Sequence, residues 1–403
     1  MQVPSWVPRE ILPGSAGECL SQSQLLLVTA VIPFLLDAIA EIGGTLRTST
    51  SISTTPGAAG LVGSRNAFGD EQLEADVAAE RILRAALGRC AHVVAASSEE
   101  DPVERAVHIS SASAASAASA ASSSGLASAS GLASGSASAS ASASASASAS
   151  ASASASASDE VFTAAFDPLD GSSIVGANWA VGTIVGVWRG QSALGVRPDE
   201  GLAAAVLGVY GPRTTALVAL REPGRPGFCL HVGLGGADNS ADNGDGGDGD
   251  RTAAGIHVHL IDPRVRFSPP PFSTRYFAPA NLRAAAEDPA YAGLVSHYIA
   301  RRYTLRYSGG LVPDVAHALA KGHGVYLSPV AAGARAKLRR LYELCPVALV
   351  VECAGGCAVD SDLGGALRGQ RILARAVRSC DERGGIFCGN AEEVEAIFAL
   401  LKK

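Results

Sequence analysis

A long tract of alanine and serine is the feature that most limits how this chain can fold. Residues 110–158 consist almost entirely of these two residue types and include a long, strict Ala-Ser alternation. Alternation with period two can mimic a strand, but neither side chain offers a large apolar face, so the tract cannot offset the entropy lost on ordering. The sequence therefore predicts an exposed, disordered insertion, with the packed core built from the residues on either side.

The rest of the chain is long enough for one large α/β domain or two closely joined ones. The formal net charge of −6 gives no electrostatic case for nucleic acid as a partner. The eight cysteines lie mostly in apolar runs, which predicts buried, reduced thiols. The apolar residues 25–39 are short for a membrane span and are interrupted by Pro33 and Asp37, so we expect a core helix over 25–47 and no membrane partner.

Two carboxylates and a proline are packed into positions 166–173, which read Phe-Asp-Pro-Leu-Asp-Gly-Ser-Ser. Apolar runs at 161–166 and 180–188 predict buried strands, so the carboxylates are expected where a strand ends and a turn begins. Pro168 fixes its own φ and biases the residue before it towards an extended shape. Three oxygen groups, from Asp167, Asp170 and the Leu169 carbonyl, can then converge on a hard cation such as Mg²⁺ or Mn²⁺.

The small residues that follow offer a second kind of site. Gly171, Ser172 and Ser173 can turn their backbone N–H groups and hydroxyls towards an anion. A cation beside an anion cradle indicates phosphate chemistry, whereas the alternative interpretation is an ordinary Asp/Gly/Ser turn.

A second predicted strand, over 92–96, also delivers acidic residues at its C-terminal end, among them Glu99 and Glu100. Open α/β sheets place their sites at this end of the strands. A helix that is expected to end at about residue 87 carries Asp76 near its start, where negative charge is favoured. The Ala/Ser tract separates these acids from Asp167, so they can share one site only if the tract loops out and returns.

The remaining segments alternate between strand-like and helical patterns. We expect strands over 201–221 (two, joined at 211–213), 256–261, 304–307, 325–327 and 385–388. We expect helices from 281 to about 302, near 314, over 337–343, and after Asn390, where Glu393 occupies the capping-box position. A Gly/Asp/Asn-rich stretch over 235–250 reads as a second loop insertion.

Assembled, these segments supply six candidate carboxylates: Asp76, Glu99, Glu100, Asp167, Asp170 and Glu343. Six carboxylates at one site would repel one another unless cations neutralised them, which argues for two or three Mg²⁺ ions. Arg283, Arg306 and Lys337, together with Tyr307, are candidates for holding a second phosphate or sugar hydroxyls, although each alone could be a solvated surface group.

On these motifs the chain resembles the fructose-1,6-bisphosphatase/sedoheptulose-1,7-bisphosphatase family, and its sedoheptulose branch more closely. The Asp-Pro-Leu-Asp-Gly motif alone would also admit inositol monophosphatases, but the set of matching stretches is specific. These stretches are 66–73, 98–100, 166–174, 181–184, 210–215, 303–307, 309–315 and 336–343.

The resemblance implies a layered α/β/α/β/α sugar-phosphatase fold. It implies Mg²⁺-dependent hydrolysis of the 1-phosphate of sedoheptulose 1,7-bisphosphate in the Calvin cycle, in the chloroplast stroma. The domain layout expected from it is an irregular N-terminus over 1–24, a phosphatase region with the metal motifs over 25–230, a loop insertion over 231–255, and a sugar-binding α/β region over 256–403.

The resemblance also assigns roles to single residues. The implied metal ligands are Glu99, Glu100, Asp167, the Leu169 carbonyl, Asp170 and Glu343. Asp76 and Glu100 would position or deprotonate the attacking water. The implied substrate contacts are Asp170, Gly171, Ser172 and Ser173 at the scissile phosphate, and Asn281, Tyr307 and Lys337 at the sugar and distal phosphate. Arg306 would reach a neighbouring subunit of a homodimer, with a tetramer as the alternative.

Three departures from the family pattern affect these expectations. Residues 48–65 contain no cysteine, where the plant sedoheptulose enzymes carry a pair under thioredoxin control, so thioredoxin is not expected to act at this place. Ser328 stands where the fructose enzymes have a substrate-contacting tyrosine, which favours a seven-carbon substrate. The N-terminus is neither Arg-rich nor clearly amphipathic and predicts no transit peptide, which leaves the cytoplasm as an alternative location.

Two rival functions remain open from the sequence. The first is a fructose-1,6-bisphosphatase or an enzyme that accepts both bisphosphates. The second is a non-catalytic paralogue that acts as a binding protein, although every expected acidic position is filled.

Overall fold

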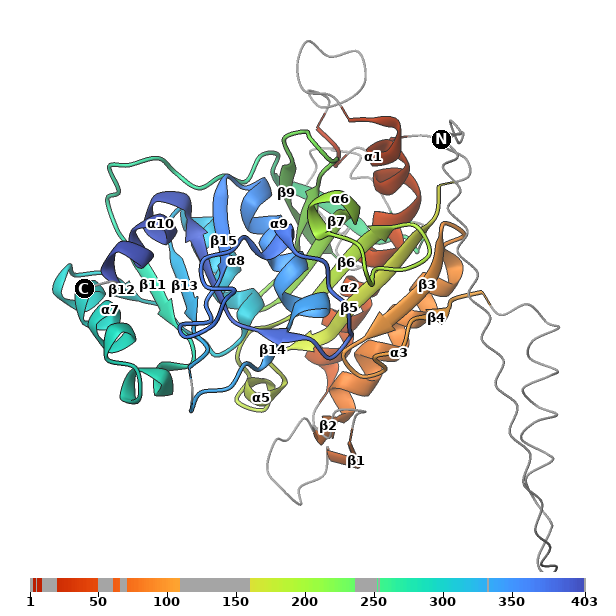
Figure 1. Cartoon of the computed structure of the whole chain (residues 1–403). Coiled ribbons are helices and arrows are strands. Elements are labelled where there is room, and N and C mark those ends of the chain that lie inside the picture. Colours follow the sequence, from red (N-terminus) through yellow and green to blue (C-terminus); the bar gives the residue numbers. More distant parts are fainter. Residues whose placement is uncertain are drawn as a thin grey trace, which may run out of the picture.

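The described part of the protein is built on two large β-sheets and three layers of helices, stacked in the order α/β/α/β/α (Figure 1). The computed structural model describes residues 3–4, 6–8, 20–49, 61–65, 71–108, 160–235, 252, 254–331 and 333–401. The five-layer fold expected from the family resemblance is confirmed. The Ala/Ser tract, residues 66–70 and most of the Gly/Asp-rich loop lie outside the described residues.

The larger sheet has eight strands, and every neighbouring pair is antiparallel except β3 and β5. Its inner strands are buried on both faces, as the continuous apolar runs predicted. The strands, in spatial order, are β10 (His257–Asp262), β9 (Phe228–Gly235), β8 (Thr214–Leu220), β7 (Leu202–Tyr210), β6 (Val181–Arg189), β5 (Phe162–Asp170), β3 (Val93–Ser98) and β4 (Arg105–Ala106).

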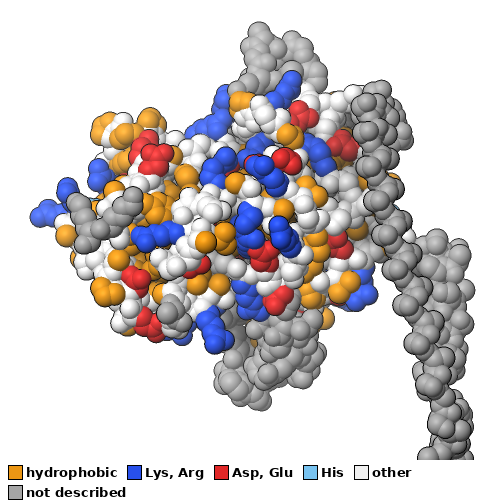
Figure 2. All heavy atoms as spheres, in the orientation of Figure 1, with side chains coloured by type: hydrophobic (Ala, Val, Ile, Leu, Met, Phe, Trp, Pro, Cys, Tyr) orange, Lys and Arg blue, Asp and Glu red, His pale blue; other side chains and the backbone are white. Residues whose placement is uncertain are grey.

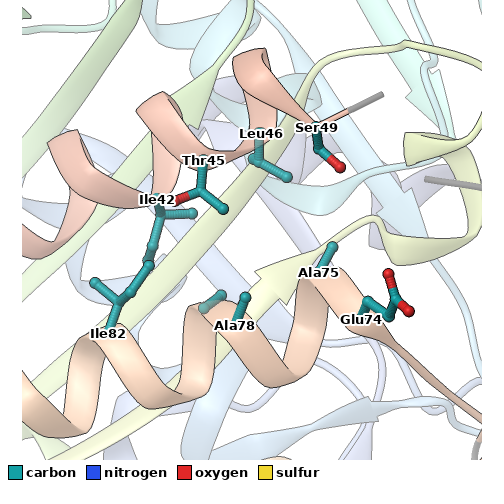
Figure 3. Close-up of a pocket in the computed structure, with 9 residues that line it drawn as sticks. Ile42, Thr45, Leu46, Ser49, Glu74, Ala75, Ala78 and Ile82 are labelled. Atoms are coloured by element: carbon teal, nitrogen blue, oxygen red, sulfur yellow. The ribbon is translucent and has the colours of Figure 1, made fainter. Parts of the chain in front are cut away.

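One face of this sheet is covered by α2 (Ile32–Thr48) and α3 (Glu74–Arg89), which lie against each other. Short α1 (Gln22–Leu26) and a π-helical turn, η2 (Leu27–Val31), lead into α2. Figure 3 shows the side chains of Ile42 on α2 and Ile82 on α3 meeting in an apolar pocket of about 180 Å³. The segment from 22 to 48 is therefore the core helix that the sequence predicted.

By length and composition, the helical segment Gln22–Thr48 would be able to cross a membrane. However, 61% of its most apolar window is buried inside the protein. Asp37 in its middle is also buried and accepts a hydrogen bond from the Thr252 hydroxyl. These features are those of a helix that packs in a protein core.

The middle layer separates the two sheets and contains α8 (Leu311–Lys321), a second π-helical turn, η6 (Arg340–Leu344), and α9 (Cys345–Cys353). Nearly every residue of α9 is buried, because sheets cover it on both sides. Trp188 and Tyr342 are among the largest fully buried side chains here. The seven cysteines within the described residues are all free thiols, and all but Cys357 are buried.

The smaller sheet has five strands, of which β11 pairs in parallel with β12 and β13 while β17 is antiparallel to its neighbours. Its outer face is covered by α7 (Pro289–Ala300) and α10 (Ala391–Leu400). The strands, in spatial order, are β12 (Thr304–Leu305), β11 (Tyr276–Pro279), β13 (Val325–Ser328), β17 (Ile386–Asn390) and β15 (Gly356–Asp360).

Short elements complete the fold at the edges of the sheets. They are β1 (Leu61–Arg65) with β2 (Glu71–Leu73), β14 (Leu338–Arg339) with β16 (Arg383–Gly384), α5 (Ser172–Val175), α6 (Pro198–Gly201), η5 (Leu282–Ala286) and η7 (Ile372–Ala374). Figure 2 shows Lys and Arg side chains gathered near the centre of the face seen in Figure 1, although the net charge is −6.

Three predicted helices differ in detail. The helix expected from 281 to about 302 is a 3-10 turn followed by α7, because Asp288 caps a new helix by accepting the Tyr291 N–H at 2.8 Å. The helix expected over 337–343 begins only at Arg340, after β14. The predicted capping box at Asn390 is absent: its side-chain oxygen accepts the Gly324 N–H at 2.9 Å instead.

Candidate active site

Strand β5 brings the Asp-Pro-Leu-Asp motif into the large sheet through a β-bulge. Asp167 lies opposite Ile184 and Asp170 opposite Gly182, so three steps along β5 match two along β6. Residues three apart in a regular strand face opposite sides, and the extra residue reverses this parity. Both carboxylates therefore reach the layer between the sheets, while Leu169 packs in the core on the other face. The strand continues through Asp170, so the expected turn directly after 166 was wrong.

Pro168 occupies the bulge, where a residue without an N–H group leaves no gap in the ladder. Its carbonyl accepts the Thr183 hydroxyl at 2.7 Å, and this hydroxyl also pairs with the Tyr210 phenol at 2.7 Å. Asp167 folds back on its own chain and accepts the Leu169 N–H at 3.0 Å. The bulge is thus fixed by side chains of the two neighbouring strands.

Three of the predicted acids meet between the sheets. Ligand oxygens of Glu99, Asp167 and Glu343 all lie within 4.8 Å of one another. They arrive from the end of β3, from the bulge in β5 and from η6. Asp167 and Glu343 are buried, and the Glu99 side chain is 20% exposed. We call these three residues the acid cluster.

Burial and mutual repulsion disfavour negative charge in the acid cluster. Burial raises the pKa of Asp167 well above its ordinary value, and the neighbouring Glu99 and Glu343 carboxylates raise it further. The pKa of Glu343 is also raised well above its ordinary value, first by burial and then by Glu99. The cluster therefore favours neutralisation by protons or by a cation.

Arg339 supplies one positive charge at this place. Its buried guanidinium forms an ion pair with Glu99, and its backbone N–H donates to the Glu343 carboxylate. The contact between Arg339 and Glu99 was not predicted from the sequence. The sequence signal for this contact is the position of Arg339, a basic residue four positions before Glu343, which was expected to bind metal.

Asp170 lies next to the acid cluster but is turned towards α8. Its two carboxylate oxygens accept the N–H groups of Leu311 at 3.1 Å and Val312 at 2.6 Å, at the start of that helix. Burial raises the pKa of Asp170 to about 6 despite these two hydrogen bonds. The structure thus gives Asp170 a role as the cap of α8, which the sequence did not predict.

Asp76 and Glu100 complete the acidic side of the site. Asp76 is buried in the first turn of α3 and accepts the Leu73 N–H at 2.9 Å. Burial, followed by the charges of Glu100 and Glu99, raises the pKa of Asp76 to about 7. Glu100 is half-buried in the bend that follows β3. All six predicted carboxylates therefore lie in one region.

The next turn of chain holds the residues that were predicted from the sequence to bind an anion. Gly171 adopts a left-handed conformation with φ of 88°, and a Cβ atom there would lie 3.3 Å from the Val181 side chain. Ser172 and Ser173 then form the first turn of α5, whose N–H groups point out of the helix start. Ser173 is exposed and lines the pocket described next.

A pocket of about 420 Å³ opens beside the cradle and collects most of the predicted sugar-binding residues. Asn281, Tyr307 and Lys337 line it, as does Ser328. Asn281 is held by donating its side-chain amide to the Pro329 carbonyl at 2.8 Å. Two short segments of chain, 167–173 and 337–343, each contribute one residue to the acid cluster and at least one to the lining of the pocket.

Two arginines extend the cationic character of this pocket, and a third lies outside it. Arg283 and Arg335 line the pocket with Lys337, and all three side chains are exposed. Arg335 was not predicted as a pocket residue. Its position, two residues before the predicted substrate residue Lys337, is a signal by which it could have been found. Arg306 lies over the Tyr276 ring, with its guanidinium 5.7 Å from the ring centroid, and is not among the lining residues.

The residues of the acid cluster fit a hard divalent cation. All donor atoms are carboxylate oxygens, which Mg²⁺ and Mn²⁺ prefer over softer metals. The raised pKa values of Asp167 and Glu343 show that the folded protein holds these carboxylates where an added positive charge would be stabilising.

Two sequence families match the chain. Fructose-1-6-bisphosphatase, C-terminal domain, matches residues 271–402, and fructose-1-6-bisphosphatase, N-terminal domain, matches residues 135–238. A class 1 fructose-1,6-bisphosphatase of Syntrophotalea carbinolica is 30% identical over 354 residues, which are 87% of this chain and 84% of that protein.

A chloroplastic sedoheptulose-1,7-bisphosphatase of Triticum aestivum is more similar but over a shorter stretch, 38% identical across 234 residues. The match covers 58% of this chain and 51% of that protein, so the chain spans about half the length of its chloroplastic relatives. A crystal structure of a Toxoplasma gondii protein, provisionally assigned as a sedoheptulose-1,7-bisphosphatase, is 29% identical with a TM-score of 0.64 and covers 92% of this chain and 93% of that one.

Proposed function

Because the chain belongs to the fructose-1,6-bisphosphatase family, we propose that it hydrolyses the 1-phosphate of sedoheptulose 1,7-bisphosphate in an Mg²⁺-dependent reaction. Water is consumed, and sedoheptulose 7-phosphate and inorganic phosphate are released. The observation that carries the proposal is that the same two segments of chain supply both a buried acid cluster and a cationic pocket, since a bisphosphate needs both ends recognised.

Glu99, Asp167 and Glu343 would hold the metal, with Glu100, Asp170 and the Leu169 carbonyl as further ligands of a site for two or three ions. Bound Mg²⁺ would neutralise the carboxylates, polarise the phosphate and lower the pKa of water. The two hydrogen bonds from the start of α8 fix the orientation of the Asp170 carboxylate.

Asp76 and Glu100 would orient the attacking water and accept its proton. The pKa of Asp76, raised to about 7 by burial, suits a group that takes up a proton near neutral pH. Gly171, Ser172 and Ser173 would hold the scissile phosphate by N–H groups and hydroxyls at the start of α5, next to Asp170.

The pocket would hold the sugar and the distal phosphate through Asn281, Tyr307 and Lys337. Its strongest support is charge: no hydrogen bond or ion pair joins Arg283, Arg335 or Lys337 to another residue within the described part of the chain. Unpaired cations around one pocket favour a dianion such as a phosphate. Ser328 in the lining leaves space that a larger aromatic side chain would fill, which favours a seven-carbon chain.

The rival functions give different results in one assay. Phosphate release from sedoheptulose 1,7-bisphosphate and fructose 1,6-bisphosphate would be measured with Mg²⁺ and with EDTA. We expect a higher kcat/KM for the seven-carbon substrate and no turnover in EDTA. A clear preference for fructose would establish the first rival, and no release from either substrate would establish the non-catalytic one.

A pair of variants tests the pocket. Arg335→Gln removes one pocket cation, so we expect KM for the bisphosphate to rise about tenfold with little change in kcat, because a charged hydrogen bond is worth roughly 1.5–3 kcal/mol. Arg301→Gln is the matched control, because Arg301 is exposed but does not line the pocket. An equal KM in the two variants would exclude the pocket as the distal phosphate site.

We propose the plastid stroma as the location and a homodimer as the assembly. The location is supported by the chloroplastic relatives from Triticum aestivum, Spinacia oleracea and Chlamydomonas reinhardtii. Arg306 is exposed and lies outside the pocket lining, which supports a contact with a second subunit over a contact with the substrate. Sedimentation of the wild type beside Arg306→Glu would test this role, since a lone monomer in both would contradict it.

A further inference from the structure

Arg340 is an arginine that the core of the protein encloses completely. Arg340 is only 1% exposed, so its guanidinium is almost completely withdrawn from water. Its partner, Asp360 at the end of β15, is 2% exposed, and their closest atoms are 2.8 Å apart. A buried ion pair carries a large desolvation cost, so its presence in this place asks for an explanation.

The guanidinium of Arg340 joins three separate segments of chain. Nη1 donates to Asp360, Nη2 donates to the Ile372 carbonyl at 3.2 Å, and Nε lies 3.9 Å from the Glu382 carboxylate. The backbone N–H of Arg340 also donates to the Glu382 carbonyl at 2.7 Å. A Cβ atom on Gly384 would lie 3.4 Å from Nη1, so the covering strand β16 closes tightly over this side chain.

These contacts fix the residue at which η6 begins. Arg340 is the first residue of the π turn, and its carbonyl accepts the N–H of Cys345, five residues later. Glu343 lies on the same turn and reaches back to the N–H of Arg339. Arg339 and Arg340 thus bind on opposite sides: the first contacts Glu99 in the acid cluster, and the second is anchored in the C-terminal core.

We propose that the buried Arg340–Asp360 pair is a positioning device that sets the orientation of Glu343 in the acid cluster. The inference rests on the proposed role of that cluster as a metal site. The pair touches neither the cluster nor the pocket, so Arg340 acts through the backbone of η6 and is not a catalytic residue. Without the anchor, the turn would be free to shift. The Glu343 carboxylate would then move relative to Glu99 and Asp167, and metal ligands tolerate little displacement.

The competing explanation is that the pair only stabilises the fold. The two explanations differ in what an apolar replacement does. Exchanging a buried ion pair for apolar side chains of similar volume is often neutral or stabilising, whereas removing one partner alone leaves a buried charge. Arg340→Met combined with Asp360→Leu removes both charges together, keeps the net charge, and so separates fold stability from the position of Glu343.

The test measures Mg²⁺ binding by titration calorimetry and thermal unfolding, using the full chain. In the double variant we expect the Mg²⁺ Kd to weaken by about tenfold or more, with Tm changed by only a few degrees. The matched control is Arg221→Met with Glu352→Leu, which removes an ion pair at 2.9 Å near the other end of α9. The control should bind Mg²⁺ as the wild type does.

The outcomes separate this inference from the proposed function. An unchanged Mg²⁺ Kd in a folded double variant overturns the inference, as does an equal loss in the control. If the double variant does not fold, Asp360→Asn takes its place, since it keeps an oxygen for Arg340, and a weakening of about threefold or more supports the inference while no change overturns it. A wild type that binds Mg²⁺ but releases no phosphate would contradict the proposed function and leave the positioning role standing.

Discussion

Within the described residues, the protein contains two π turns that are built alike and carry different side chains. η2 (Leu27–Val31) precedes α2, and η6 (Arg340–Leu344) precedes α9. In each, the first residue after the turn donates its N–H five residues back, and a proline follows at the second position of the α-helix, Pro33 or Pro346. A proline ring clashes with the carbonyl four residues earlier, and widening the turn gives that carbonyl room.

The difference lies in what the two turns carry. Leu27, Val28 and Val31 in η2 are buried apolar residues that pack in the core between α2, α3 and the large sheet. In η6, Arg340 is tied to the C-terminal core and Glu343 enters the acid cluster. A π turn that accommodates a following proline thus serves core packing in η2. In η6 the same kind of turn positions a buried carboxylate in the acid cluster. The backbone motif alone does not mark function; its charged contacts do.

The largest expected effect is the loss of the Glu343 charge. Glu343→Gln keeps the shape and an oxygen for the Arg339 N–H but weakens the ligand, so we expect kcat to fall by more than about 100-fold with Tm little changed. Thr29→Val is the matched change in η2, where the Thr29 hydroxyl bonds the Leu25 carbonyl at 2.8 Å. It should leave phosphate release unchanged, and near-normal turnover in Glu343→Gln would refute the assignment of the acid cluster.

An intermediate effect is expected from the prolines. Pro346→Ala removes the clash that favours the wide turn, and relaxation to an α-helix would rotate Glu343 by roughly 100° relative to α9. The Arg340 anchor resists this, so we expect the Mg²⁺ Kd to weaken by about three- to tenfold. Pro33→Ala should change the free energy of unfolding by about 1 kcal/mol at most and leave Mg²⁺ binding intact. Titration calorimetry on both variants decides, and equal effects would end the distinction between the turns.

Much of the architecture follows from patterns that the sequence carries openly. Continuous apolar runs predicted the buried strands β5 and β6, and the glycine and proline at Gly211 and Pro212 predicted the hairpin between β7 and β8. The ends of β3 and β5 were correctly expected to supply acids to one region, because parallel neighbours end at the same edge.

What the sequence left out depends on long-range contacts. The bulge at Pro168 needs the Thr183 hydroxyl from the next strand, and no local pattern shows that partner. The helix over 337–343 was placed three residues early because β14 pairs with β16, more than 40 residues later in the chain. The anchor of Arg340 is likewise invisible locally, since Asp360 lies 20 residues away and an arginine is normally expected at the surface.

The smallest expected effect concerns Asp37, a buried carboxylate on α2 shortly after η2. It is the counterpart of Glu343, the buried carboxylate within η6. Asp37 accepts hydrogen bonds from the Thr252 hydroxyl and from the Ala254 N–H at 3.3 Å, and it is not a member of the acid cluster. Burial raises its pKa above the ordinary value. Because the folded state then binds the proton more tightly than the unfolded state, this group stabilises the fold below about pH 4, and its contribution is lost as the pH rises through the folded pKa.

Asp37→Asn removes that titration. We therefore expect the difference in free energy of unfolding, wild type minus variant, to decrease as the pH is raised from about 4 to about 8. The variant loses the acceptor for the Ala254 N–H but no longer buries a charge, and these opposite contributions keep the difference at pH 8 within about 1 kcal/mol. Urea unfolding of both proteins across this range checks the slope, and phosphate release should not change. A difference that stays constant with pH would show that the pKa of Asp37 is the same in the folded and unfolded states. A loss of activity would mean that the region of η2 is coupled to the site after all.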